Sequence, residues 1–138
     1  MSEQNERNRA VIEQFRTNGG KTAGQYATST LLLLTTIGAK SGQKRTNPLA
    51  YLAEGDRLYI FASHGGSPTN PDWYHNLVKH PEVHVEVGTD AFDAIATVIT
   101  GGERDRIYAR QAALRPNFGE YQQKTQRTIP VVALTRRG

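Results

Sequence analysis

Six short strand-like segments, most of them joined by tight turns, constrain the fold of this chain more than any other feature. In 57–63, for example, Leu58, Ile60 and Ala62 alternate with side chains of the opposite face. Parallel strands need helical crossovers, and only one helical segment separates the first five strands. The pattern therefore predicts an α+β fold, a six-stranded antiparallel barrel with peripheral helices. The strands are expected at 31–37, 45–53, 57–63, 83–87, 91–100 and 129–134.

A helix is expected at the N-terminal end, over about residues 5–18. Val11, Ile12 and Phe15 follow the helical i, i+3/i+4 spacing, and the remaining side chains are largely charged. Asn18 and the glycines after it are typical of a helix end. This narrow apolar stripe is expected to support at most a weak association with a membrane surface.

Two more helices are indicated by their start signals. Asn70 is expected at the N-cap of a helix with Pro71 in its first position, and this helix ends before residue 81. Thr100 and Glu103 match a capping box that opens another helix. Pro116 is expected to end that helix.

Length and composition favour a single domain spanning 1–138, with a core at about 30–135. A chain of 138 residues is long enough for one hydrophobic core. It has no cysteine, which excludes disulfides, thiolate metal sites and a cysteine nucleophile. The longest apolar run, 31–34, is far too short to span a bilayer, and the polar residues 1–7 do not resemble a signal peptide. We therefore expect a cytoplasmic protein.

The chain is basic, with a formal net charge of +4, which favours an anionic partner. Lys40, Lys44 and Arg45 fall in one short turn, whereas most other basic residues are scattered. Nucleic-acid binding usually needs a broader basic stripe with exposed aromatic side chains. We therefore expect a small phosphorylated ligand and no nucleic acid.

The basic turn at 38–45 is the first candidate binding segment. It combines Gly38 and Gly42 with the hydroxyl of Ser41 and the three cations. Glycines let backbone amides turn toward an anion, and an arginine such as Arg45 holds phosphate or carboxylate oxygens in a bidentate way. The spacing is not that of a Walker A loop. A soluble hairpin tip is an equally good interpretation of the composition alone.

A second segment, 62–66 followed by 70–74, favours the ligand-binding interpretation. Ser63, His64 and two glycines end a strand, and a helix N-terminus, which favours anions, follows. Trp73, in the first turn of this helix, either stacks on a flat ring or belongs to the core.

No side-chain cluster predicts independent catalytic chemistry. The four histidines lack metal-ligand spacing, so no metal site is expected. Ser63 is not flanked as in a nucleophile elbow, and no pair of carboxylates stands out. If the chain is an enzyme, a bound cofactor is expected to carry the reaction.

Three motifs, in the right order and at matching spacing, resemble those of the deazaflavin-dependent nitroreductase family. The first is 34–49, the second comprises 62–66 and 70–77, and the third comprises 121–122 and 127–132. The resemblance covers about 30–134, essentially the whole domain. It implies a split β-barrel and coenzyme F420 as the hydride carrier.

The resemblance also implies roles for individual residues. The phosphate and glutamyl tail of the cofactor would contact the basic turn, and its ring would lie along the next strand, beside the second motif. The implied cofactor-binding residues are Ala39, Lys40, Ser41, Gly42, Lys44, Arg45, Asn47, Pro48, Leu49, Ala62, Ser63, His64, Gly65, Trp73 and Asn76. The implied substrate-binding residues are Ala50, Phe118 and Tyr121.

The chain departs from the family pattern at several of these positions. A family member that reduces bulky nitroimidazoles has tyrosines at the positions of Ala50, Arg115 and Phe118, so only Tyr121 keeps its hydroxyl. Nitroimidazole reduction is therefore not expected here. Ala39 and His64 each replace a residue that is commonly basic, which removes cationic contacts to the cofactor tail.

The expected reaction is hydride transfer from the reduced deazaflavin to a small conjugated electrophile, such as a quinone, an enone or a nitro compound. Ser63 or Tyr121 would serve as a catalytic hydrogen-bond donor to the acceptor oxygen. Two alternatives stay open: an FMN-binding split-barrel oxidoreductase, and a non-catalytic deazaflavin carrier. Barrels of this kind often pair, so a homodimer is an alternative to a monomer.

Overall fold

The computed structural model describes residues 3–17 and 31–137, and its secondary structure follows the predicted order closely. The helices are α1 (Glu3–Thr17), the 3-10 turn η2 (His64–Gly66), α2 (Asp72–Lys79), α3 (Gly101–Leu114) and α4 (Pro116–Lys124). The strands are β1 (Leu31–Ile37), β2 (Lys44–Glu54), β3 (Arg57–Phe61), β4 (Glu82–Val87), β5 (Asp90–Ile99) and β6 (Val131–Arg136).

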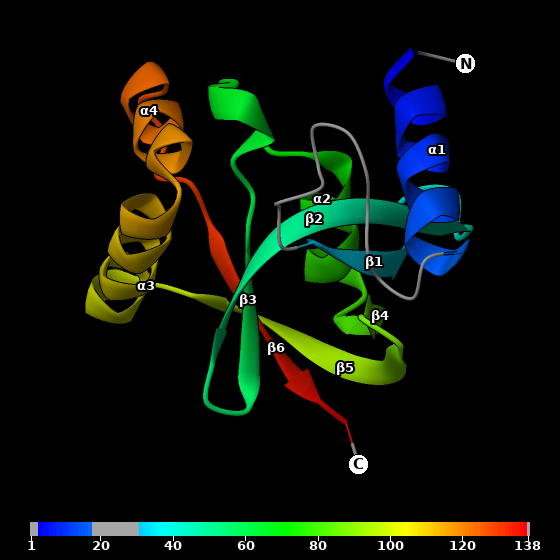
Figure 1. Ribbon diagram of the computed structural model, residues 1–138. Coiled ribbons are helices and arrows are strands. Elements are labelled where there is room, and N and C mark those ends of the chain that lie inside the picture. Colours follow the sequence, from blue (N-terminus) through cyan, green and yellow to red (C-terminus); the bar gives the residue numbers. More distant parts are fainter. Residues whose placement is uncertain (1–2, 18–30, 138) are drawn as a thin grey trace.

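The six strands form a closed antiparallel barrel in the order β1-β2-β3-β6-β5-β4. Hairpins join β1 to β2, β2 to β3, and β4 to β5, as the sequence predicted. The contact of β3 with β6 joins segments about 70 residues apart, and it closes one side of the barrel. Figure 1 shows α3 and α4 together on one side of the barrel and α1 on the other. The predicted barrel with peripheral helices is confirmed.

Two hydrophobic clusters follow from the alternation of side chains along the strands. Ile60 and Ala62 face the barrel interior, where they pack with residues such as Leu34 and Val85. Tyr59 and Phe61 point to the opposite face of β3 and pack in a second cluster beneath α3 and α4. The predicted two-faced strand is therefore confirmed, and each face has its own core.

Strand β2 pairs with β1 along its first part and with β3 along its last four residues. Residues 44–50 pair with β1, but pairing with β3 begins only at Tyr51. Residues 44–50 therefore have a strand neighbour on one side and an open edge on the other. Such an edge carries backbone groups without strand partners, which makes it a place for a ligand to bind. This opening is the split of the barrel.

The helix ends differ from the predictions in three places. Pro71, not Asn70, occupies the N-cap of α2, and the Asn70 side chain instead accepts a hydrogen bond from Arg127. Thr100 is the N-cap of α3 but makes no side-chain cap bond. Pro116 ends α3 as expected, yet it also opens α4, which the sequence analysis missed. Proline suits the first turn of a helix, because its missing N–H has no intrahelical partner there.

The apolar stripe of α1 packs against the barrel. Val11 and Phe15 are buried, and Arg16 forms a two-point ion pair with Glu86 of β4. The predicted stop signal from Asn18 onward lies outside the described residues. Among those that are described, no helix is long and apolar enough to cross a membrane.

Candidate cofactor and substrate site

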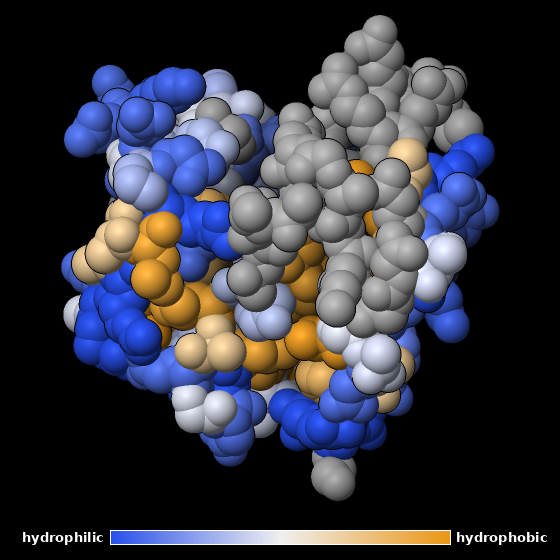
Figure 2. All heavy atoms as spheres, in the orientation of Figure 1, coloured by the Kyte–Doolittle hydropathy of each residue, from blue (hydrophilic) through white to orange (hydrophobic). Residues whose placement is uncertain are grey.

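A hollow of about 320 Å³ lies between the open part of β2, the end of β3 and the α3–α4 connection. Figure 2 shows apolar side chains gathered in a hollow on this face, beside the α3–α4 pair. Six residues that the sequence analysis singled out line it: Pro48, Leu49, Ala50, Ser63, Phe118 and Tyr121. Its other lining residues are Leu31, Phe61, Arg115 and Asn117. Of these, only Arg115 was noted beforehand, as a departure from the family pattern.

Aromatic rings form one wall of this hollow. The ring of Phe118 meets those of Phe61 and Tyr121 edge to face, with centroids 5.6 Å and 5.4 Å away. The Tyr108 hydroxyl donates a 2.6 Å hydrogen bond to the carbonyl of Phe118, which fixes the start of α4. Burial raises the pKa of Tyr108, so this donor stays protonated at neutral pH. This hydrogen bond from α3 therefore holds the aromatic wall in position.

Two residues that line the hollow carry hydroxyl groups, Ser63 and Tyr121. The Asn117 side-chain amide donates to the Tyr121 oxygen at 3.0 Å. Because this bond occupies a lone pair of the phenol and not its proton, Tyr121 keeps its O–H for another acceptor. Asn117 lies four residues before Tyr121 on α4, and the sequence analysis missed this pairing because it did not predict the helix.

The Ser63 loop has an unusual backbone. His64 adopts a φ of +49°, which non-glycine residues rarely occupy. Its ring Nδ1 lies 3.1 Å from the carbonyl oxygen of Thr69. Gly66 has a φ of +83°, and a Cβ there would stand 3.0 Å from the Tyr121 carbonyl oxygen. The loop therefore packs directly on α4, in contact with the residue that carries the second hydroxyl.

The glycine-containing turn is held mainly by its own hydrogen bonds. The Gly38 amide donates to the Gln43 carbonyl and the Gly42 amide to the Gly38 carbonyl. A Cβ on Gly38 would lie 2.5 Å from the Ser41 hydroxyl oxygen and 3.2 Å from the Gln43 carbonyl oxygen, so a larger residue would displace the Ser41 side chain and crowd the turn. Within the described part of the chain, the amides of Lys40 and Ser41 have no acceptor. Both residues are exposed, so two amides and one ammonium group are available to an anion.

Asn76 contacts this turn, whereas Trp73, on the same helix, lies in the core. Asn76 is buried; its side-chain oxygen accepts from the Ala39 amide at 2.9 Å, and its nitrogen donates to the Thr36 hydroxyl at 3.1 Å. Trp73 is 6% exposed and packs in the barrel-interior cluster. Asn76 therefore supports the turn. Trp73 belongs to the core, which was one of the two interpretations of this residue.

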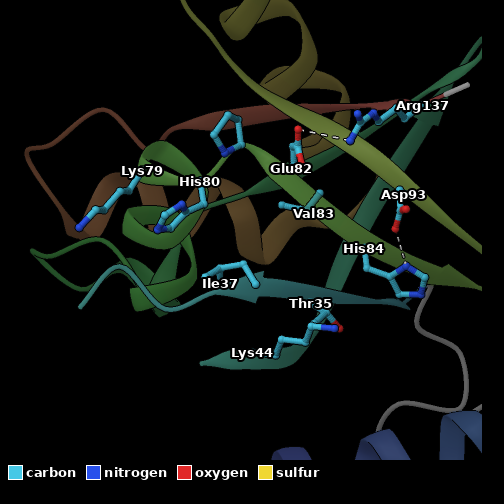
Figure 3. Close-up of a pocket in the computed structure, with 11 residues that line it drawn as sticks. Thr35, Ile37, Lys44, Lys79, His80, Glu82, Val83, His84, Asp93 and Arg137 are labelled. Carbon is cyan, nitrogen blue, oxygen red and sulfur yellow. Dashed lines mark hydrogen bonds and ion pairs between the residues drawn. The ribbon is translucent and has the colours of Figure 1, made fainter. Parts of the chain in front are cut away.

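Lys44 and Arg45 are adjacent but lie on opposite faces of β2. Arg45 pairs with the buried Thr36, and Lys44 pairs with Ile37 on the outer face. Lys44 lines a different cavity, of about 590 Å³, together with Thr35, Ile37, Lys79, His80, Pro81, Glu82, Val83, His84, Asp93 and Arg137. In that cavity Glu82 pairs with Arg137, and His84 with Asp93 (Figure 3). Lys44 therefore lines a cavity other than the hollow, although its side chain is on the same face of β2 as those of Pro48 and Ala50.

The closed antiparallel barrel, the open edge of β2 and the apolar hollow with its two hydroxyls define a split β-barrel of the cofactor-binding kind. Among the described side chains, no group of three or more histidines and acids could hold a metal ion.

Comparison with known proteins identifies the family. A model of the F420H2-dependent quinone reductase family matches residues 7–136. The F420H2-dependent quinone reductase Rv1261c of Mycobacterium tuberculosis (strain ATCC 25618 / H37Rv) is 43% identical over 109 residues, which cover 77% of this chain and 73% of that protein. A solved F420-H2 dependent reductase (FDR-A) superimposes with a TM-score of 0.70 at 39% identity, covering 76% of this chain and 93% of that one. A structure described as a domain-swapped dimer gives a TM-score of 0.72 at 36% identity, covering 91% and 95%.

The chain therefore belongs to the F420H2-dependent quinone reductase family. This confirms the predictions of a split barrel, of an oxidoreductase and of coenzyme F420 as its cofactor, and the FMN alternative is not favoured.

The residues present fit this cofactor. A phosphate and a glutamyl tail need cations and free amides; Lys40, Ser41 and Arg45 carry such groups at the turn and would hold them. A flat ring with a polar edge needs an apolar surface beside unpaired backbone groups, and the open edge of β2 beside the hollow provides both.

Proposed function

We propose that this chain binds reduced F420 along the open edge of β2 and reduces a quinone in the adjoining hollow. The observation that carries the proposal is the convergence of three segments far apart in sequence, near residues 48–50, 61–63 and 115–121, on one apolar hollow. Enones and nitro compounds share the conjugated, electrophilic character of quinones and are proposed as secondary acceptors.

We assign the tail of the cofactor to the turn and its ring to β2. Lys40, Ser41 and Arg45 would bind the phosphate and the glutamyl carboxylates, with the Ala39 and Gly42 backbone shaping the turn. Asn47, Pro48 and Leu49 would run along the ring, with Ala62, His64 and Gly65 on its other side. When bound, the reduced cofactor supplies the hydride; the protein supplies alignment and excludes water.

The side chains of the hollow have separate roles in this proposal. Ala50 and Phe118 would form the apolar contact surface for the quinone. Tyr121, whose oxygen accepts from Asn117, would donate its proton toward the carbonyl oxygen on which negative charge develops. Ser63 offers a second donor to the same oxygen. The bond from Asn117 would hold the Tyr121 donor in place before the substrate arrives, which is what makes such a hydrogen bond effective.

The test begins with the unmodified protein. We expect it to quench F420 fluorescence on titration, to bind FMN far less tightly, and to oxidise F420H2 when menadione is added. Tight binding without turnover across a panel of quinones would instead indicate a deazaflavin carrier. Tighter binding of FMN than of F420 would refute the proposal.

Two neighbouring variants test the proposed placement of the tail. Arg45→Ala is expected to weaken F420 binding by about tenfold, the value of one charge-assisted hydrogen bond. Lys44→Ala is expected to have the smaller effect, because its side chain lines the separate cavity of about 590 Å³ and not the hollow. The opposite order would place the tail in the cavity that Lys44 lines.

The proposal extends to the partner, the cellular location and the oligomeric state of the chain. A small-molecule acceptor is the proposed partner, with no nucleic acid, at most weak contact with a membrane surface, and a cytoplasmic location. A homodimer is the proposed alternative to a monomer, and one solved relative is described as a domain-swapped dimer. Light scattering coupled to size exclusion distinguishes the two states.

A further inference from the structure

One guanidinium group holds both arms of the Ser63 loop. Arg127, in the segment between α4 and β6, donates from Nη2 to the carbonyls of Ala62 at 3.1 Å and Ser63 at 2.9 Å. Its Nε donates to the Ser67 carbonyl at 3.0 Å, and its Nη1 to the Asn70 side-chain oxygen at 2.7 Å. Four hydrogen bonds from one rigid fork thus join the start and the end of the loop.

Besides these bonds, the His64 ring lies against the Thr69 carbonyl and Gly66 packs on α4. The internal backbone bonds of the loop are those from Gly66 to Ser63 and from Ser67 to His64. The positive φ of His64 costs free energy and persists only where surrounding contacts enforce it. The hydrogen bonds from Arg127 lie on both sides of His64 in the sequence, so they are well placed to maintain its backbone conformation.

The geometry calls for arginine and not only for a positive charge. All four acceptors are neutral, and within the described residues Arg127 has no carboxylate partner. Partial burial accordingly lowers the pKa of Arg127. A lysine ammonium has three donors at one point and cannot span acceptors on two arms of a loop as a planar fork does.

We infer that Arg127 is a positioning residue that fixes the Ser63 hydroxyl and the His64 backbone in the orientation needed for quinone reduction. The inference rests on the proposed function for its catalytic consequence, because Ser63 lines the substrate hollow. Its structural part, the clamping of the loop, can be measured without cofactor or substrate.

Arg104 provides a matched control. It also reaches this segment, donating to the Ile129 carbonyl at 3.0 and 2.8 Å and to the Gln122 side chain at 2.7 Å. It is the more buried of the two arginines, and none of its hydrogen bonds reaches the Ser63 loop. Arg104→Lys therefore replaces a buried arginine of the same segment but keeps the four hydrogen bonds from Arg127 to the Ser63 loop.

The first experiment is hydrogen exchange, followed by mass spectrometry, on the full chain without ligand. In Arg127→Lys, amides of 62–70 are expected to exchange about tenfold faster than in the parent, the effect of losing a hydrogen bond to a charged group. Arg104→Lys is expected to leave the exchange of this loop unchanged. If Arg127→Lys does not fold, Asn70→Ala removes one acceptor and should accelerate the same peptide by about threefold.

The second experiment tests whether Arg127 acts through Ser63. Arg127→Lys is expected to lower kcat with menadione by about tenfold in the parent, and by less than twofold in a Ser63→Ala background. Equal losses in both backgrounds, or unchanged exchange of the loop, would overturn the inference. Faster exchange in a chain whose parent shows no F420H2 oxidation would support the clamp and refute the proposed function instead.

Discussion

The support that Asn76 gives to the glycine-containing turn leads to a prediction that separates stability from cofactor binding. Asn76→Ala removes the acceptor of the Ala39 amide and the donor to the Thr36 hydroxyl in one step. Both Asn76 and Thr36 are buried, so water does not readily replace the second of these bonds. Thr36→Val removes only that second bond and leaves the turn attached.

The magnitude follows from the number of bonds lost. A net hydrogen bond contributes about 1 kcal/mol to stability, and leaving a buried partner unsatisfied raises the cost. We therefore expect Asn76→Ala to lower the free energy of unfolding by about 2–3 kcal/mol, and Thr36→Val by about 1 kcal/mol. Only Asn76→Ala also removes a hydrogen bond to the turn beside Lys40 and Ser41, which leaves the bond from Lys79 to the Ala39 carbonyl. Only this variant should therefore weaken F420 binding, by about five- to tenfold.

Urea unfolding measures the stability change, and quenching of F420 fluorescence measures the binding change. Exposed His75, on the same helix, provides a control: His75→Ala should alter neither quantity appreciably. The reasoning is refuted if Asn76→Ala unfolds at the same urea concentration as the parent. It is refuted equally if Thr36→Val and Asn76→Ala weaken F420 binding to the same extent.

Three further predictions follow from individual contacts. Tyr121→Phe should lower kcat with menadione by more than about threefold, since a preorganised donor to a developing oxyanion usually changes kcat by more than this. A smaller loss would exclude Tyr121 as the donor. Tyr108→Phe should lower the free energy of unfolding by about 1–2 kcal/mol, because it removes the buried hydrogen bond to the Phe118 carbonyl. An unchanged midpoint in thermal or urea denaturation would contradict this. Hydrogen bonding to Arg16 holds the pKa of Glu86 below its ordinary value of 4.5. The ion pair should therefore contribute about 0.5–1 kcal/mol to the free energy of unfolding above pH 4.5. This contribution should be lost as the pH falls through the lowered pKa of Glu86, and Glu86→Gln should remove this part of the acid sensitivity of unfolding.

The hollow combines carbon surface with polar groups. Ala50 and Phe118 contribute carbon surface, Tyr121 a hydroxyl group and Arg115 a cation.

The local sequence pattern determined the strands and most turns, because side-chain alternation and turn residues act over a few neighbours. Leu58, Ile60 and Tyr59 show this: their alternation alone assigned them to two faces, and the two hydrophobic clusters follow that division. The three motifs likewise identified the segments that line the hollow and, through the family resemblance, the cofactor. Helix α4 was missed because a proline ends one helix and begins another by the same chemistry.

The tertiary structure alone decided the rest, because those features depend on which distant segment becomes a neighbour. Register with β1 places Lys44 and Arg45 on opposite faces, and the late start of pairing with β3 opens the edge of β2. Asn76 supports the turn and Arg127 clamps the Ser63 loop through bonds that span 37 to 65 residues. Patterns along the chain specify elements and faces, whereas the positions of hydrogen-bond partners are fixed only when the barrel closes.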